Sequence, residues 1–285
     1  MSKTSIAQYI TQLASDDHDQ QQSAAIQLIE TGPDAIPPVI DALQSDAADV
    51  RYLAAWVLGE LGDTRAVVPL IDALEDDDAR VRDWAAKALG EIGDQRATMP
   101  LIKLLERAHS AGTRRNIAAA LGWLGDQRAL DALIFLLADT HPETRSMAAD
   151  ALGKMGNSKA VPALIRALQD DDSIVRMRVA YALGELGDIQ AGRALMTALN
   201  DPNEWVRYNA ALSIGQVGYR EAFDTLLTIL RSDKSANGRR GAALALGALG
   251  DDRAVDPLRS ALTDGDDVVI EAIDRALQRL GYAVE

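Results

Sequence analysis

The most constraining feature of this sequence is a short phrase, ALGELGD and its variants, that recurs at nearly constant spacing along the chain. Its second glycine returns every 30 to 32 residues. These glycines are Gly32, Gly62, Gly93, Gly125, Gly156, Gly187, Gly218, Gly250 and Gly281. A period of this length indicates a repeat architecture, in which each unit buries its apolar face only against its neighbours.

Each unit contains two segments with apolar residues at helical spacing. In one unit the first segment is AVVPLIDAL (66–74), the turn is EDDD (75–78) and the second segment is ARVRDWAAKALGEIG (79–93). We therefore expect an all-α fold, a right-handed α-solenoid (α-α superhelix) of about nine two-helix repeats. The predicted organisation is a single solenoid over residues 1–285, with an N-terminal cap repeat (1–32), regular repeats (33–250) and a C-terminal cap repeat (251–285).

Local signals in each unit predict where the helices begin and end. An Asp in the turn accepts hydrogen bonds from the free N–H groups that open the second helix, and the recurrent glycine supplies the left-handed conformation that ends it. We expect the glycines to act only in this way. Pro69, Pro100 and Pro257 fall inside first helices, where proline is expected to produce a kink.

An arginine stands eight residues before the first glycine of the phrase in seven successive units. These are Arg51, Arg82, Arg114, Arg145, Arg176, Arg207 and Arg239. Gln21 and Ile270 replace it in the two end units. This distribution predicts a structural ladder, in which each arginine pairs with an Asp of an adjacent turn and links neighbouring repeats.

Composition excludes several kinds of chemistry and partner. The absence of cysteine excludes disulfides and thiolate sites. The formal net charge of −14 disfavours nucleic acid and anionic lipid as partners, since the basic residues are dispersed. No secretory signal or membrane span is apparent, so the expected location is cytoplasmic.

The pattern D-x-x-V-R-x-x-A-A-x-A-L-G-x-L-G-D, at residues 78–94 and 172–188, resembles the HEAT-like repeats named after phycobilisome (PBS) lyases. This resemblance covers essentially the whole chain and implies an armadillo-like α-solenoid. The segment RYLAAWVLG (51–59) is similar to a Tyr-x-Ala-Ala-Trp segment of E-type phycocyanobilin lyase subunits. It implies an alternative function as a bilin lyase subunit or phycobiliprotein chaperone, with phycocyanobilin as the transferred ligand.

Deoxyhypusine hydroxylases, which belong to the same group, hold a di-iron centre with paired His-Glu motifs. This sequence has no His-Glu pair, because His18, His109 and His141 are followed by Asp, Ser and Pro. We expect these histidines to be solvated turn or loop residues, and we predict neither a metal site nor a resident cofactor.

The positions that stacking leaves free to bind a ligand lie on one sector of the second helix, at offsets of 1, 2, 5 and 9 from the repeat arginine. Six of the twelve aromatic residues fall on this sector, and Tyr, Trp and Arg are the usual anchors of binding surfaces. The predicted concave groove comprises Tyr52, Trp56, Asp83, Trp84, Lys87, Arg115, Asn116, Trp123, Met147, Asp150, Arg178, Tyr181, Tyr208 and Asn209.

No nucleophile, base and orienting group can be recognised together, so no catalytic residue is predicted. The leading hypothesis is a noncatalytic scaffold that binds a protein partner in an acidic groove with aromatic anchors. The alternative is the bilin lyase or chaperone role, with a phycobiliprotein or a second HEAT-repeat chain as partner. A third possibility is a structural spacer without a ligand.

Overall fold

The computed structural model describes residues 3–108 and 110–282 of the protein. Every regular element in these residues is an α-helix or a short 3₁₀ turn, so the predicted all-α solenoid class is confirmed. The chain forms two compact units, Met1–Leu136 and Leu137–Glu285. The boundaries of the single array and its cap repeats stay a prediction.

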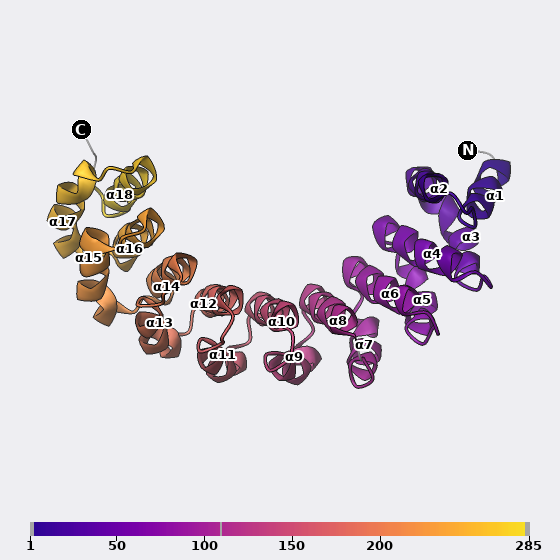
Figure 1. The fold of residues 1–285 in the computed structure, drawn as a ribbon, viewed down its shortest axis with the longest axis horizontal. Helices are drawn as coiled ribbons and strands as arrows, with labels where there is room; N and C mark the ends of the chain where they lie inside the picture. The colour runs from indigo at the N-terminus through magenta and orange to yellow at the C-terminus, as the bar shows by residue number, and fades with distance from the viewer. Residues whose placement is uncertain (1–2, 109, 283–285) are drawn as a thin grey trace. The chain divides into compact units, whose positions relative to one another are not determined.

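The first unit consists of two layers of helices (Figure 1). Helices α1, α3, α5 and α7 form one layer, and α2, α4, α6 and α8 form the other. The bounds are α1 (Lys3–Gln12), α2 (His18–Thr31), α3 (Ile36–Ala42), α4 (Ala48–Leu61), α5 (Val67–Ala73), α6 (Ala79–Ile92), α7 (Thr98–Leu105), α8 (Ala111–Leu124) and α9 (Leu130–Leu136).

The second unit repeats this two-layer arrangement, with α11, α13, α15 and α17 in one layer and the even-numbered helices in the other. The bounds are α10 (Pro142–Met155), α11 (Val161–Ala167), α12 (Ser173–Leu186), α13 (Gly192–Ala198), α14 (Glu204–Val217), α15 (Phe223–Ser232), α16 (Ala236–Leu249), α17 (Val255–Ser260) and α18 (Asp267–Arg279).

The first helices from α3 onward are each a 3₁₀ turn that continues into a short α-helix. The turns are η1 (Gly32–Ala35), η2 (Thr64–Ala66), η3 (Gln95–Ala97), η4 (Gln127–Ala129), η5 (Ser158–Ala160), η6 (Ile189–Ala191), η7 (Arg220–Ala222) and η8 (Asp252–Ala254), and η9 (Ala261–Thr263) follows α17. Pro69, Pro100 and Pro257 each occupy the third residue of their α-helix. The expected mid-helix kink is therefore wrong, because a first-turn N–H has no intrahelical acceptor to lose.

The ends of the second helices follow the predicted signals. Asp78 caps α6 and Asp172 caps α12 by accepting hydrogen bonds from backbone N–H groups of the first turn. The recurrent glycine after α6, Gly93, has a φ of 76°, in the left-handed region that favours glycine. Both capping predictions are confirmed at these helices.

The first glycine of the repeated phrase has a different task, which the sequence interpretation missed. Gly90 lies inside α6 and faces α8 so closely that a methyl group on it would lie 2.7 Å from Ala120 Cα. Gly59 faces Ala88 in the same way at 2.9 Å, and Gly247 faces the Cα of Ala276 at 2.6 Å. At these three positions successive second helices therefore touch through their backbones, and a larger side chain would require the helices to move apart.

The repeat arginines form rungs between consecutive turns. The Arg51 Nε and Nη2 groups donate to the two carboxylate oxygens of Asp76, at 2.7 and 2.8 Å, and its Nη1 donates to the Ser45 carbonyl at 2.9 Å. The same bidentate pairing recurs in the second unit. Its pairs are Arg145–Asp170, Arg176–Asp201, Arg207–Asp233 and Arg239–Asp264. Arg114 donates Nη1 to the Ala108 carbonyl at 3.1 Å.

The rung at Arg82 departs from the predicted ladder. Arg82 keeps its bonds to the turn carbonyls of Asp76 and Asp77, at 2.6 and 2.9 Å, but among the described residues no carboxylate pairs with it. The reason is that Ala108 stands where the next turn would supply its Asp. Gln21, in the first repeat, donates to the Ser15 carbonyl at 2.8 Å and so replaces only the backbone half of a rung.

The close contact at Gly90 gives a prediction on stability. Gly90→Ala is expected to lower the free energy of unfolding by about 1–3 kcal/mol, because the added methyl group meets the backbone of α8. Gly112→Ala in α8 is the matched control, since the nearest atom to its methyl group would be Ser110 Oγ at 3.4 Å. It should leave stability unchanged or raise it by up to about 1 kcal/mol. Urea unfolding followed by circular dichroism compares the two; equal effects would contradict the close contact.

The rung at Asp76 gives a prediction on pH dependence. The hydrogen bond from Arg51 lowers the pKa of Asp76, so the rung stabilises the folded state fully above the unfolded carboxyl value of about 3.9. This stabilisation is lost as the pH falls through the lowered pKa. Asp76→Asn should lower the free energy of unfolding by roughly 1–2 kcal/mol at pH 7, and the difference from wild type should shrink below about pH 4. Urea unfolding at a series of pH values measures both.

The control for this pH series is Asp77→Asn, which removes the neighbouring exposed carboxylate. It should change the unfolding free energy little at any pH. A cost of Asp76→Asn that persists unchanged at pH 2 would show that the carboxylate charge does not contribute through the rung.

Candidate functional site

The predicted groove residues all lie on second helices, and none of them is buried. Trp123 and Tyr181 are 46% and 44% exposed, which excludes the interpretation of these two rings as core residues. The set divides between the two units, with the residues from Tyr52 to Trp123 on the first and those from Met147 to Asn209 on the second.

The first unit brings two predicted tryptophans together across neighbouring helices. The ring centroids of Trp56 on α4 and Trp84 on α6 are 5.9 Å apart, with the ring planes tilted by 46°. The Lys87 ammonium lies over the Trp84 ring at 4.5 Å, a cation–π distance. The indole N–H of Trp56 donates to Glu60 at 3.1 Å, and Lys87 pairs with Glu91 at 3.3 Å. We call these five residues the tryptophan cluster.

The tryptophan cluster rests on the close contact between α4 and α6. Because Gly59 has no side chain, the Glu91 carboxylate lies directly over it; a methyl group there would be 2.7 Å from Glu91 Oε2. Both tryptophans are half-buried, so each ring contacts the protein and leaves part of its surface to solvent. This combination of held rings and accessible faces is typical of binding anchors.

The other predicted residues of the first unit have separate surroundings. The Trp123 ring lies against the α6 backbone at Gly90. Asp83 accepts a hydrogen bond from the Thr113 hydroxyl at 2.6 Å and so joins α6 to α8. Tyr52 lies under the Arg80 guanidinium at 5.0 Å, a contact that the sequence interpretation missed. Arg115 is exposed and Asn116 is half-buried.

In the second unit two predicted residues form a charged pair, and a third, Tyr208, pairs with an aromatic residue outside the predicted set. Arg178 lies 3.6 Å from the Asp150 carboxylate, and burial raises the pKa of Asp150 although Arg178 and Lys154 oppose this. The charge of Glu185 raises the pKa of the neighbouring Tyr181.

The aromatic pair of the second unit is Tyr208 and Trp205, whose rings meet edge to face at 6.0 Å. Trp205 is 46% exposed. Asn209 donates to the Trp205 carbonyl at 2.8 Å, so its amide serves the helix that carries it. Met147 is half-buried on α10.

A cleft of about 370 Å³ lies on the same sector of the second helices in the second unit. It is lined by Leu212, Gln216, Leu244, Ala248, Arg275, Ala276 and Arg279. Apart from Ala276, these residues stand at offsets 5 and 9 from the repeat position in three consecutive helices. The predicted sector of the second helices therefore does carry a cleft in this unit. The residues that line it are not aromatic and lie outside the predicted groove set.

The two described histidines occupy exposed positions. His18 opens α2 and His141 precedes α10, and both are exposed; His109 lies outside the described residues. In the described part of the chain no three His, Asp or Glu residues are grouped as metal ligands would be. None of the described helices is long and apolar enough to cross a membrane.

Stacked helix pairs, backbone contacts at glycine and arginine rungs together define an α-solenoid repeat protein. The family model for HEAT repeats matches residues 6–86, 67–141, 132–203 and 192–278. The chain therefore belongs to the HEAT-repeat family. Among curated proteins, none is similar enough in sequence to count as a match.

Solved structures of three proteins resemble this chain at low sequence identity. YibA from Escherichia coli is 22% identical over 94% of this chain and 98% of its own, with a TM-score of 0.60. The CpcE–CpcF complex of phycocyanin lyase from a Nostoc species is 23% identical over 86% of this chain and 93% of the matched chain, with a TM-score of 0.49. Human deoxyhypusine hydroxylase is 22% identical over 90% of this chain and 98% of its own, with a TM-score of 0.39. The likeness to YibA shows the fold alone.

Proposed function

We propose that this protein is a noncatalytic interaction scaffold that uses the tryptophan cluster of its first unit to bind a protein partner. The observation that carries the proposal is the half-exposed pair of Trp56 and Trp84, with centroids 5.9 Å apart on neighbouring second helices. Membership of the HEAT-repeat family supports a repeat scaffold as the general class.

The charges around the tryptophan cluster favour a basic, amphipathic helical segment as the occupant. Glu60 and Glu91 flank the rings, and only Glu91 is paired with a lysine. The net charge of −14 attracts a basic partner over longer distances. Apolar residues on one face of such a helix would contact the rings, while its Lys or Arg residues would meet Glu60.

A second candidate is the binding of a tetrapyrrole such as phycocyanobilin in a bilin lyase or chaperone role. The observation that favours it is the Lys87 ammonium beside the Trp84 ring, since a flat conjugated ligand with carboxylates would use both groups. Its partner would then be a phycobiliprotein or a second HEAT-repeat chain.

Selection from a displayed library of helical peptides tests the leading proposal without a known partner. The wild type should enrich basic amphipathic sequences. Their affinity should fall at least about tenfold for the double variant Trp56→Ala/Trp84→Ala, because buried aromatic anchors carry most of such binding energy. Fluorescence titration of the selected peptides measures the affinities, after circular dichroism has shown that the variant is folded.

Trp205→Ala is the matched control, since it removes an exposed tryptophan from the second unit. It should leave peptide affinity unchanged. Peptides that bind the double variant as tightly as the wild type would overturn the assignment of the site to the tryptophan cluster. A bilin absorption band that shifts with the wild type and not with the double variant would instead support the second candidate.

A further inference from the structure

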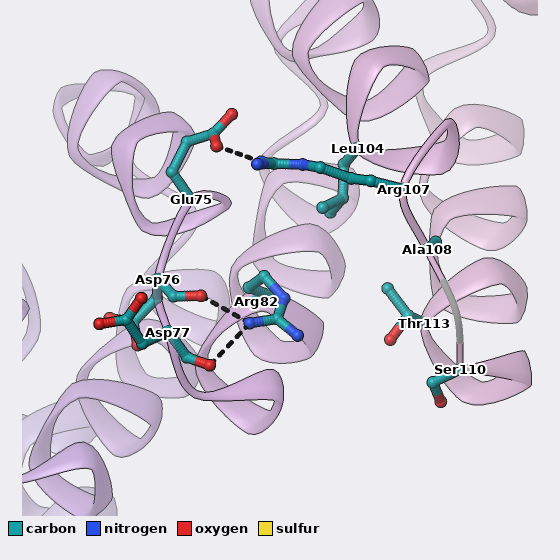
Figure 2. Close-up of a pocket in the computed structure, with 9 residues that line it drawn as sticks. All are labelled: Glu75, Asp76, Asp77, Arg82, Leu104, Arg107, Ala108, Ser110 and Thr113. Carbon is teal, nitrogen blue, oxygen red and sulfur yellow. Dashed lines mark hydrogen bonds and ion pairs between the residues drawn. The ribbon is translucent and has the colours of Figure 1, made fainter.

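A cleft of about 380 Å³ opens in the first unit between the turn before α6 and the turn before α8 (Figure 2). It is lined by Glu75, Asp76, Asp77, Arg82, Leu104, Arg107, Ala108, Ser110 and Thr113. None of the tryptophan cluster lines it. The cleft coincides with the rung at Arg82 that has no carboxylate.

In the five bidentate rungs described above, an Asp carboxylate occupies the equivalent part of the turn. In each, the arginine Nε and Nη2 donate to the two oxygens of one Asp, at distances of 2.6 to 3.0 Å. The same Asp also accepts the backbone N–H two residues later, at 2.8 to 3.0 Å. Three donors thus surround every rung carboxylate.

At the rung of Arg82 the guanidinium and the following turn are present, but the carboxylate is not; Arg82 and Ser110 line the cleft from opposite sides. Ala108 occupies the position of the Asp, six residues before Arg114 as Asp201 is six residues before Arg207. The Arg82 Nη1 is engaged with the turn carbonyls, while its Nε and Nη2 and the Ser110 N–H have no acceptor among the described residues. We call Arg82, Ala108 and Ser110 the open rung.

The acidic side chains around the open rung are largely engaged with other groups. Asp76 is paired with Arg51, and Glu75 with Arg107 and Lys103. Figure 2 shows the Arg107 side chain extending to Glu75 above the cleft. Within residues 3–108 and 110–282, the Asp77 carboxylate is the one lining the cleft that has no ion pair, and it is exposed. An incoming anion therefore meets an unpaired guanidinium edge.

We propose that the open rung is a binding site for a carboxylate group. In five rungs of the described residues an Asp side chain brings a carboxylate to the equivalent guanidinium edge. The Ala108 side chain carries no carboxylate, and the cleft leaves room for one that comes from a ligand. The group can come from a small free carboxylate or from an Asp or Glu side chain of a peptide, since both present the same two oxygens.

Titration with sodium acetate at constant ionic strength, observed in ¹H–¹⁵N NMR spectra of the full chain, tests the proposal. The Arg82 Nε–H and Ser110 amide signals should shift together and saturate. The shift should be absent in Ala108→Asp, where the chain supplies the carboxylate itself. The Ser110 shift should also be absent in Arg82→Gln, which keeps the backbone bond, as Gln21 does, and removes the guanidinium edge.

Asp201→Ala provides the positive control, because it recreates an open rung at Arg176 with the Asn203 N–H as third donor. Acetate should then shift the Arg176 Nε–H signal as well. Linear, unsaturable shifts at Arg82, or shifts that persist in Ala108→Asp, would overturn the proposal. So would binding at the engineered open rung with none at Arg82.

A blocked Gly-Asp-Gly tripeptide distinguishes the two sources of the carboxylate. Saturation by both acetate and the tripeptide would assign the site to acidic side chains as well as to small anions. Saturation by acetate alone would assign it to small carboxylates. Neither outcome depends on Trp56 or Trp84, so this test and that of the proposed function fail independently.

Discussion

The bidentate pair between a repeat arginine and the Asp of the following turn is the interaction on which the regularity of this protein depends. One guanidinium binds the carbonyl groups of its own turn through Nη1 and the next turn through Nε and Nη2, as at Arg176. The Asp in turn fixes the backbone two residues later, just before the next second helix begins. Each rung therefore sets the position of one repeat relative to its neighbour.

The rung works together with the backbone contact between second helices. Glycine and alanine, as at Gly90 and Ala120, bring consecutive helices together at one end, while the rung fixes the turns at the other. With both ends determined, the remaining sector of each second helix is free to vary. Trp56 and Trp84 lie on that sector, where the two large rings are side by side and half-exposed. Under the proposed function, rings held in this way would lose little entropy on binding a partner.

Much of this organisation is predictable from the sequence, and the failures have identifiable causes. Helix class, the glycine that ends each second helix and the capping Asp residues follow from local rules that one repeat satisfies alone. The contact of Gly59 with Ala88 depends on the distance between repeats, which the sequence does not give. The regular spacing of the glycines therefore could not show that Gly59 has a packing role and does not end a helix. The pairing of Trp56 with Trp84 also depends on how adjacent helices pack. The open rung was detectable, because aligning the turns places Ala108 in the column of Asp76 and Asp201.

Amide–water exchange measured by NMR at the residue two positions after each rung carboxylate tests the role of the rungs most directly. The account predicts that the amides of Asp172, Asn203 and Ser235, which donate to rung carboxylates, are protected. After correction for sequence-dependent rates, Ser110 should exchange roughly tenfold faster, the factor that corresponds to about 1.4 kcal/mol. Equal protection of Ser110 and these three amides would contradict the claim that the rung carboxylate holds each turn in place.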